Sequence, residues 1–167
     1  QVNPGGYRFE GKPLVLRGGL SFTGNNDWAI PSTLEGNQTF ENSSGVLTVS
    51  RALQNNGYGL TWRVNKTAIL NNVLSGRGGM IKYGRGKLII SAPALYTGET
   101  SIDEGTLILT NSGSIGASTN IKIRATTLLD ASALRGSFAV PAGQTLRGSG
   151  TVNGPVTVQG TLIPDVP

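Results

Sequence analysis

The feature that most limits the fold is the alternation of short extended runs with glycine-containing turns in residues 84–109. The extended runs are Leu88-Ile89-Ile90, Thr100-Ser101-Ile102 and Thr106-Leu107-Ile108-Leu109. Tyr96-Thr97-Gly98 is predicted to form a corner, and no apolar residues recur at helical spacing. Strands separated by corners, without helix, are typical of one coil of a β-solenoid.

The same alternation continues along the whole chain, with about eighteen short strands at roughly nine-residue spacing. A β-sandwich would share this rhythm. The phrases Gly-Thr-Leu and Gly-Thr-Val, however, recur at Gly105, Gly150 and Gly160. A short motif that recurs along the chain favours a solenoid over a sandwich, because repeat folds are built from one recurring structural unit. With three strands a coil, we expect about six to seven coils at about 4.8 Å each, a rod of roughly 30 Å.

Composition excludes several classes of chemistry. The chain has no cysteine and no histidine, which removes disulfides, Cys- or His-ligated metals, thiol nucleophiles and imidazole bases. We therefore predict no catalytic residues, no metal and no cofactor. The net charge of +5 comes from scattered residues, with one modest basic cluster at Arg77, Lys82, Arg85 and Lys87. Because Tyr83 is the single aromatic residue interleaved with these cations, no nucleic acid is expected as partner. No apolar run is long enough to span a membrane.

The sequence predicts one solenoid domain over residues 13–167. Residues 1–12 are polar and contain Pro4-Gly5-Gly6, so they are interpreted as an extended N-terminal arm. A chain that opens at Gln1 fits a secreted protein whose leader has been removed, or a trimmed fragment of a longer chain.

Two stretches within residues 76–164 carry a resemblance to a known family. The positions that match are Gly84, Gly86, Leu88, Ile90, Tyr96, Thr97, Gly98, Thr100, Gly105, Thr106, Leu107 and Leu109, followed by the phrases that begin at Gly150 and Gly160. They resemble the autotransporter-associated β-strand repeat of bacterial passenger domains. The resemblance implies a right-handed parallel β-helix, an extracellular or bacterial cell-surface location, and structural roles for Gly84, Gly86, Tyr96, Gly98, Gly105, Gly150 and Gly160. The chain departs from the family at Ala94-Leu95 and at Glu99.

Few residues suggest a reactive or binding site. Asp103 and Glu104 are the only adjacent carboxylates, and a polysaccharide-cleaving enzyme would need such groups. The pair lies in a predicted turn, however, where acidic residues that face solvent are common. The asparagine pairs at 25–26, 55–56 and 71–72 are interpreted as turn residues that stack along the corners. Trp62 is predicted to lie in the core, since it alternates with Thr61 and Arg63.

The function expected from these features is structural: an extracellular solenoid that forms a fibre or a cell-surface stalk. A surface adhesin that binds a glycan or host receptor is the alternative, and a polysaccharide-cleaving enzyme is more distant. We expect head-to-tail stacking into a homopolymer, because neither terminus contains a recognisable cap. The residues predicted to take part are Gln1, Val2, Asn3, Pro4, Tyr7, Leu162 and Ile163.

Overall fold

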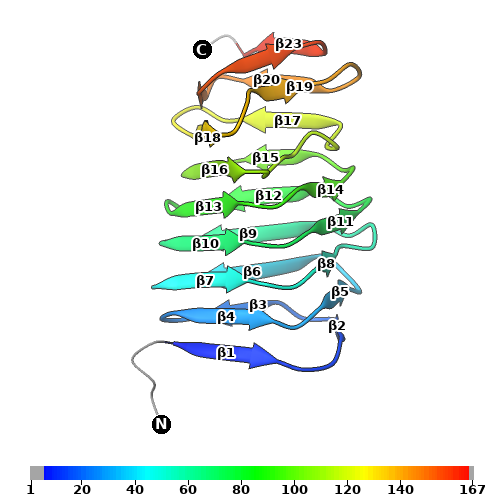
Figure 1. Cartoon of the computed structure of the whole chain (residues 1–167), viewed down its shortest axis with the longest axis vertical. Coiled ribbons are helices and arrows are strands. Elements are labelled where there is room, and N and C mark those ends of the chain that lie inside the picture. The colour runs from blue at the N-terminus through cyan, green and yellow to red at the C-terminus, as the bar shows by residue number, and fades with distance from the viewer. Residues whose placement is uncertain (1–5, 166–167) are drawn as a thin grey trace.

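The computed structural model describes residues 6–165 and confirms an all-β solenoid, consistent with a right-handed parallel β-helix. Every pair of neighbouring strands is parallel, and the coils stack along the long axis with the two termini at opposite ends (Figure 1). No helix in the described part of the chain is long and apolar enough to cross a membrane.

The strands form three long sheets, named A, B and C here, and one short sheet. Sheet A contains β1 (Tyr7–Glu10), β4 (Asn26–Ala29), β7 (Val46–Val49), β10 (Thr67–Leu70), β13 (Lys87–Ile90), β16 (Thr106–Asn111), β18 (Leu128–Leu134) and β21 (Thr151–Asn153). Sheet B contains β2 (Leu14–Leu16), β5 (Ser32–Leu34), β8 (Leu53–Gln54), β11 (Leu74–Gly76) and β14 (Ala94–Tyr96). Sheet C contains β3 (Leu20–Phe22), β6 (Gln38–Asn42), β9 (Leu60–Val64), β12 (Met80–Tyr83), β15 (Thr100–Ile102), β17 (Asn120–Ile123), β20 (Thr145–Gly148) and β23 (Thr161–Pro164). The short sheet pairs β19 (Phe138–Val140) with β22 (Val156–Val158).

The solenoid has about eight turns, so the predicted number of six to seven coils was too low. One coil takes only about twenty residues. Ser91 Oγ, for example, donates to Asn71 Oδ1 20 residues earlier, and Ser112 Oγ donates to the Ser91 carbonyl 21 residues earlier. The error arose because the strands of sheet B are as short as two residues and escape a search for longer extended runs.

The predicted arm over residues 1–12 includes a strand of the solenoid. β1 pairs in parallel with β4, in a register that sets Arg8 beside Asp27 and Phe9 beside Trp28. The part of the predicted arm that forms β1 therefore belongs to sheet A of the solenoid. Gln1, Val2, Asn3 and Pro4, which were expected to take part in assembly, lie outside the described residues.

Inward side chains from equivalent positions of successive coils stack in columns that fill the interior. In sheet A, Leu47, Ala68 and Leu88 follow one another in register, and all three are fully buried. In sheet C, Phe40 and Trp62 are in register and pack edge to face with ring centroids 5.3 Å apart. The predicted core position of Trp62 is confirmed, because its exposed fraction is 0%.

Polar side chains occupy the corners where the chain passes from one sheet to the next. Asn55 donates from Nδ2 to the Gly78 carbonyl at 2.9 Å and accepts from the Gly78 N–H at 3.0 Å. Asn42 Nδ2 donates to the Thr67 carbonyl at 2.7 Å. Asn56 has a φ of 52°, as expected of an asparagine in a turn. These amides join one coil to the next, because they satisfy backbone groups that the strand ladders leave unpaired.

Candidate functional site

The only adjacent carboxylates, Asp103 and Glu104, lie in the corner between β15 and β16 and turn toward different coils. Asp103 Oδ1 accepts from Arg124 Nε at 2.8 Å and from Ser101 Oγ at 2.5 Å. Glu104 accepts from Arg85 Nε at 3.3 Å and from the Gly84 N–H at 3.1 Å. The two acids therefore bind the coil after and the coil before their own, and they do not form a shared catalytic pair.

The surroundings of Asp103 favour its ionised form. Burial acts to raise the pKa of this carboxyl, but the hydrogen bonds from Ser101 and Arg124, together with the charge of Arg124, outweigh it and leave the pKa below its ordinary value. A carboxylate with a low pKa is neither a general acid near neutral pH nor a strong general base. The geometry thus supports an ion pair between coils.

Lys82 lies beneath the same corner. The sequence predicted it to be part of a basic cluster, and the structure places it in the interior. It was grouped with Arg77, Arg85 and Lys87 in a basic cluster, yet its exposed fraction is 0%. It occupies the inward column between Trp62 and Ile102. Strict alternation through Met80-Ile81-Lys82-Tyr83 was the available signal, because Met80 and Lys82 must share a face.

Three backbone carbonyl groups surround the buried ammonium. Lys82 Nζ donates to Gly84 O at 2.5 Å, to Glu104 O at 3.0 Å and to Tyr83 O at 3.2 Å. Burial lowers the pKa of Lys82 from 10.5 to about 8, against the opposing charge of Glu104. A neutral amine can be a nucleophile, but this one is enclosed and bonded to the corner. It serves the same purpose as Asn42 and Thr127, whose side chains donate to the carbonyl groups of Thr67 and Ile102 in other coils.

The free energy of unfolding is expected to rise as the pH increases from about 8 to 10. Because the folded-state pKa of Lys82 is the lower one, the unfolded chain binds more protons in this interval, and folding is favoured as they are released. The expected gain is about 2–3 kcal/mol. Above pH 10 the unfolded chain's tyrosines ionise, whereas burial raises the pKa of Tyr96, so Tyr96 then works in the opposite direction.

Urea unfolding at several pH values in this interval measures the effect. Lys82→Met is the matched variant, since it keeps an unbranched side chain that is only one atom shorter and cannot ionise. The rise should be present in the natural chain and absent from Lys82→Met. An equal rise in both proteins would assign the pH dependence to other groups.

The outer face of sheet C carries a hollow of about 340 Å³ beside the Asp103 corner. It is lined by Gly59, Gly79, Met80, Ile81, Glu99, Ser101, Lys122 and Arg124. Lys122 and Arg147 are register neighbours, and Arg147 Nη2 lies 3.9 Å from Glu99 Oε2. Arg124 pairs with Asp103 and Arg147 lies near Glu99, so the acidic groups offset part of the positive charge of this surface. No cluster of three metal-ligating side chains occurs within residues 6–165.

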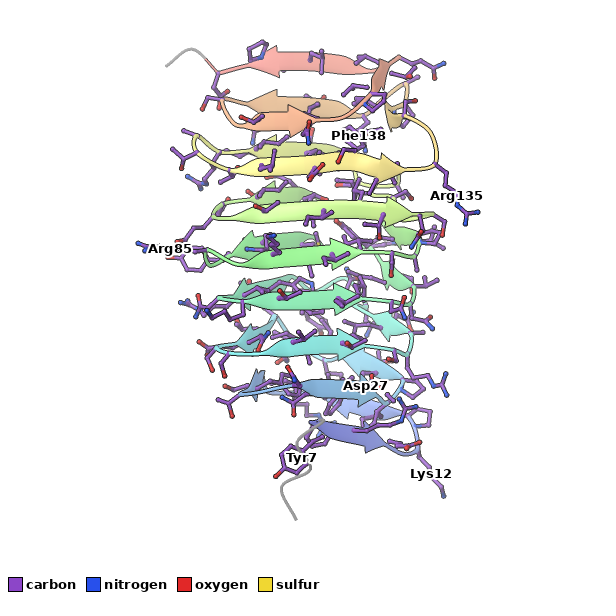
Figure 2. The ribbon with its side chains drawn as sticks, turned by 60° about the vertical axis from the view of Figure 1, so that its left-hand side comes forward. Tyr7, Lys12, Asp27, Arg85, Arg135 and Phe138 are labelled. Atoms are coloured by element: carbon purple, nitrogen blue, oxygen red, sulfur yellow. The ribbon has the colours of Figure 1, made fainter. Side chains whose placement is uncertain are left out.

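A separate cleft of about 260 Å³ lies where sheet B is interrupted. Beyond β14, the next coil contributes only an isolated bridge between Ser114 and Pro93. The cleft is floored by buried apolar side chains, including Ile115 and Phe138, and Arg135 is the one charged residue among the described lining residues. Figure 2 shows Arg135 pointing outward from its loop while Phe138 lies between the coils.

The aromatic rings on the outer faces of the sheets do not form a platform for sugars. Tyr83 is the one aromatic residue at an outward strand position in the part of the chain that the structure describes, and its ring lies 4.9 Å from the Arg63 guanidinium carbon. Tyr58, also exposed, lies in a turn. A stacking surface needs rings at successive positions, so this arrangement does not supply one.

The residues that the family resemblance marked as structural all lie at crowded or buried positions. Tyr96 is fully buried, and its hydroxyl is 2.5 Å from Thr100 Oγ1. At each marked glycine, a Cβ atom would lie within about 2.6 Å of another residue's atoms: these are Gly84, Gly86, Gly98, Gly105, Gly150 and Gly160. Leu162 and Ile163 belong to β23 at the end of sheet C. Compared with protein-family models, curated proteins and solved structures, the chain has no match in any of the three.

Proposed function

We propose that this chain is a structural β-solenoid that serves as a stalk or fibre element at a cell surface. One observation carries the proposal: inward columns and hydrogen-bonded ladders run in register from coil to coil along sheets A and C. A core that is continuous along the axis holds each coil at a fixed height over its neighbour, about 4.8 Å away. Such a rod has a defined length and presents its outer faces at defined positions.

The charged residues support the same interpretation. Asp103, Glu104 and Lys82 bind partners in neighbouring coils, so the groups that could have carried catalysis are used to join the coils. The resemblance to autotransporter repeats supports a location on a bacterial surface, where long repeat domains extend from the cell. A cysteine-free chain is compatible with that location.

A combined binding and activity assay tests this proposal. The chain is incubated with pectin, alginate and hyaluronan, with and without calcium, and both product release and retention of the protein on the immobilised polymers are measured. We expect neither turnover nor saturable retention. Turnover that Asp103→Asn abolishes would contradict the structural proposal in favour of an enzyme, because this change removes the carboxylate charge and keeps the side-chain shape.

An adhesin is the second candidate, and the cleft at the interruption of sheet B is the observation that favours it. Its apolar floor and hydroxyl-bearing rim, which includes Ser112 and Ser137, suit a small amphipathic group. In the same assay, saturable retention that Arg135→Gln weakens and Arg85→Gln leaves unchanged would support this second function. Arg85 is the matched control, because its side chain is 93% exposed and points into solvent elsewhere on the solenoid (Figure 2).

A further inference from the structure

Two tight turns replace the strand that sheet B would otherwise have in the coil after β14. Residues 110–113 form the first turn, closed by a backbone hydrogen bond of 2.8 Å, and residues 115–118 form the second, closed by one of 3.1 Å. Asn111 has a φ of 57°, a left-handed conformation that asparagine tolerates in a turn. The turns use their backbone groups locally, so the coil leaves a gap in the sheet.

The next strand on this side, β19, has a free edge because of that gap. Phe138 N–H donates to the Pro155 carbonyl at 2.8 Å, and the Val140 carbonyl accepts from Gln159 N–H at 2.8 Å, so these groups face β22. Backbone groups of successive residues in a strand point to opposite sides, and those of Ala139 therefore face the cleft. Neither the N–H nor the carbonyl of Ala139 has a hydrogen-bond partner within residues 6–165.

The cleft at this edge can admit a second backbone. Its wall opposite β19 consists of small residues, namely Ser112, Gly113, Ser114 and Gly116. Small side chains let another chain approach closely. The floor is apolar, with Ile115 1% exposed and Phe138 3% exposed. The volume of about 260 Å³ is below the roughly 300–1,000 Å³ of most small-molecule sites, so it suits individual side chains.

One positive charge at the mouth of the cleft has no acidic partner. Arg135 forms no ion pair with any carboxylate in the part of the chain that the structure describes. It lies in the loop before β19 and points outward (Figure 2). A strand that pairs in parallel with β19 would therefore have its N-terminal end beside this guanidinium, where an acidic residue is complementary.

We propose that this cleft binds an extended peptide that adds to β19 as a parallel strand and carries acidic residues at its N-terminal end. The peptide accepts a hydrogen bond from Ala139 N–H and donates one to the Ala139 carbonyl, as in strand addition. The parallel direction continues that of β19 and β22. Phe138 is the one aromatic residue in the described lining, and it is buried, so no ring is available to stack on a sugar. The proposal goes beyond the structural function and does not depend on it.

A fluorescent peptide tests the proposal directly. The probe is Asp-Glu-Gly-Thr-Leu-Ile-Leu-Thr, the sequence of residues 103–110, because it places acidic residues before residues that belong to β16 in the folded chain. A second peptide has lysine in place of both acidic residues. Binding of each peptide to the whole chain is measured by fluorescence anisotropy. We expect saturable binding of the acidic peptide and about fivefold weaker binding of the lysine peptide.

Two variants separate the contribution of the charge from that of the strand edge. Arg135→Glu should weaken binding of the acidic peptide and strengthen binding of the lysine peptide, each about fivefold, because the charge at the mouth is reversed. Ala139→Pro should weaken both peptides about tenfold, because proline removes the N–H donor. Proline is tolerated at a strand edge where that N–H makes no bond within the sheet.

Arg51→Glu is the matched control. Arg51 is also exposed and free of ion pairs within the described residues, and it lies in the corresponding corner before β8. Both edges of β8 are paired, with β5 and β11, so this corner offers no free strand edge. The control should leave both affinities unchanged.

The exchange of preference in Arg135→Glu, together with its absence in Arg51→Glu, would support the peptide proposal. This comparison decides the matter even if Ala139→Pro fails to fold, which circular dichroism would reveal. Absence of saturable binding at millimolar peptide, or equal effects of the two Glu variants, would overturn the proposal. Retention on polysaccharides that depends on Arg135, without peptide binding, would also overturn it and assign the cleft to a glycan. The turnover assay on polysaccharides tests the structural function separately.

Discussion

Trp62→Ala is expected to lower the free energy of unfolding by about 3–5 kcal/mol, the usual cost of removing a large buried aromatic side chain. The indole is fully buried and packs against the Phe40 ring in the coil below. Its Nε1 has no hydrogen-bond partner within the described chain, so the loss comes from packing and from the cavity that remains. Lys82 lies above it in the column, which limits how far the core can collapse.

Urea denaturation followed by circular dichroism measures this loss. Tyr58→Ala is the control, because Tyr58 lies in a turn and is 40% exposed. The control should change stability by less than about 1 kcal/mol. Equal effects of the two substitutions would mean that the sheet C column is not the centre of the core.

Gly78→Ala is expected to destabilise the chain by about 3 kcal/mol or more, at the upper end of what single substitutions do. A Cβ atom on Gly78 would lie 1.8 Å from the Tyr58 carbonyl oxygen and 2.5 Å from its carbon. Both are backbone atoms of the coil below, so neither can move aside without disturbing the spacing of the coils. The backbone N–H and carbonyl of Gly78 also bond to Asn55, and a displaced coil would break both contacts.

Gly136→Ala is the matched control for this prediction. An added Cβ atom there meets no atom within 4 Å, and the residue has no positive φ. Thermal unfolding of the two variants should show a large decrease in melting temperature for Gly78→Ala and almost none for Gly136→Ala. If both variants unfold like the natural chain, the close approach of the coils at Gly78 is wrong.

The sequence by itself determined the class of fold and the interior positions of individual strands. Side chains on a strand alternate between two faces, so the buried position of Trp62 follows from its immediate neighbours. The same local logic identified the extended runs that became β13, β15 and β16, and it identified Asn56 as a turn residue. Each of these features depends on a few consecutive residues, so it can be predicted from the sequence.

Only the tertiary structure decided the number of coils, the interruption of sheet B and the partners of the charged residues. Each of these depends on contacts between residues about twenty positions apart, as in the pairing of Asp103 with Arg124, 21 residues later. The pattern could not show that the Lys82 ammonium is enclosed by carbonyl groups, because one of them, that of Glu104, comes from the following coil. A buried charge is retained only where such groups converge on it, and their convergence is set by how one coil lies on the next.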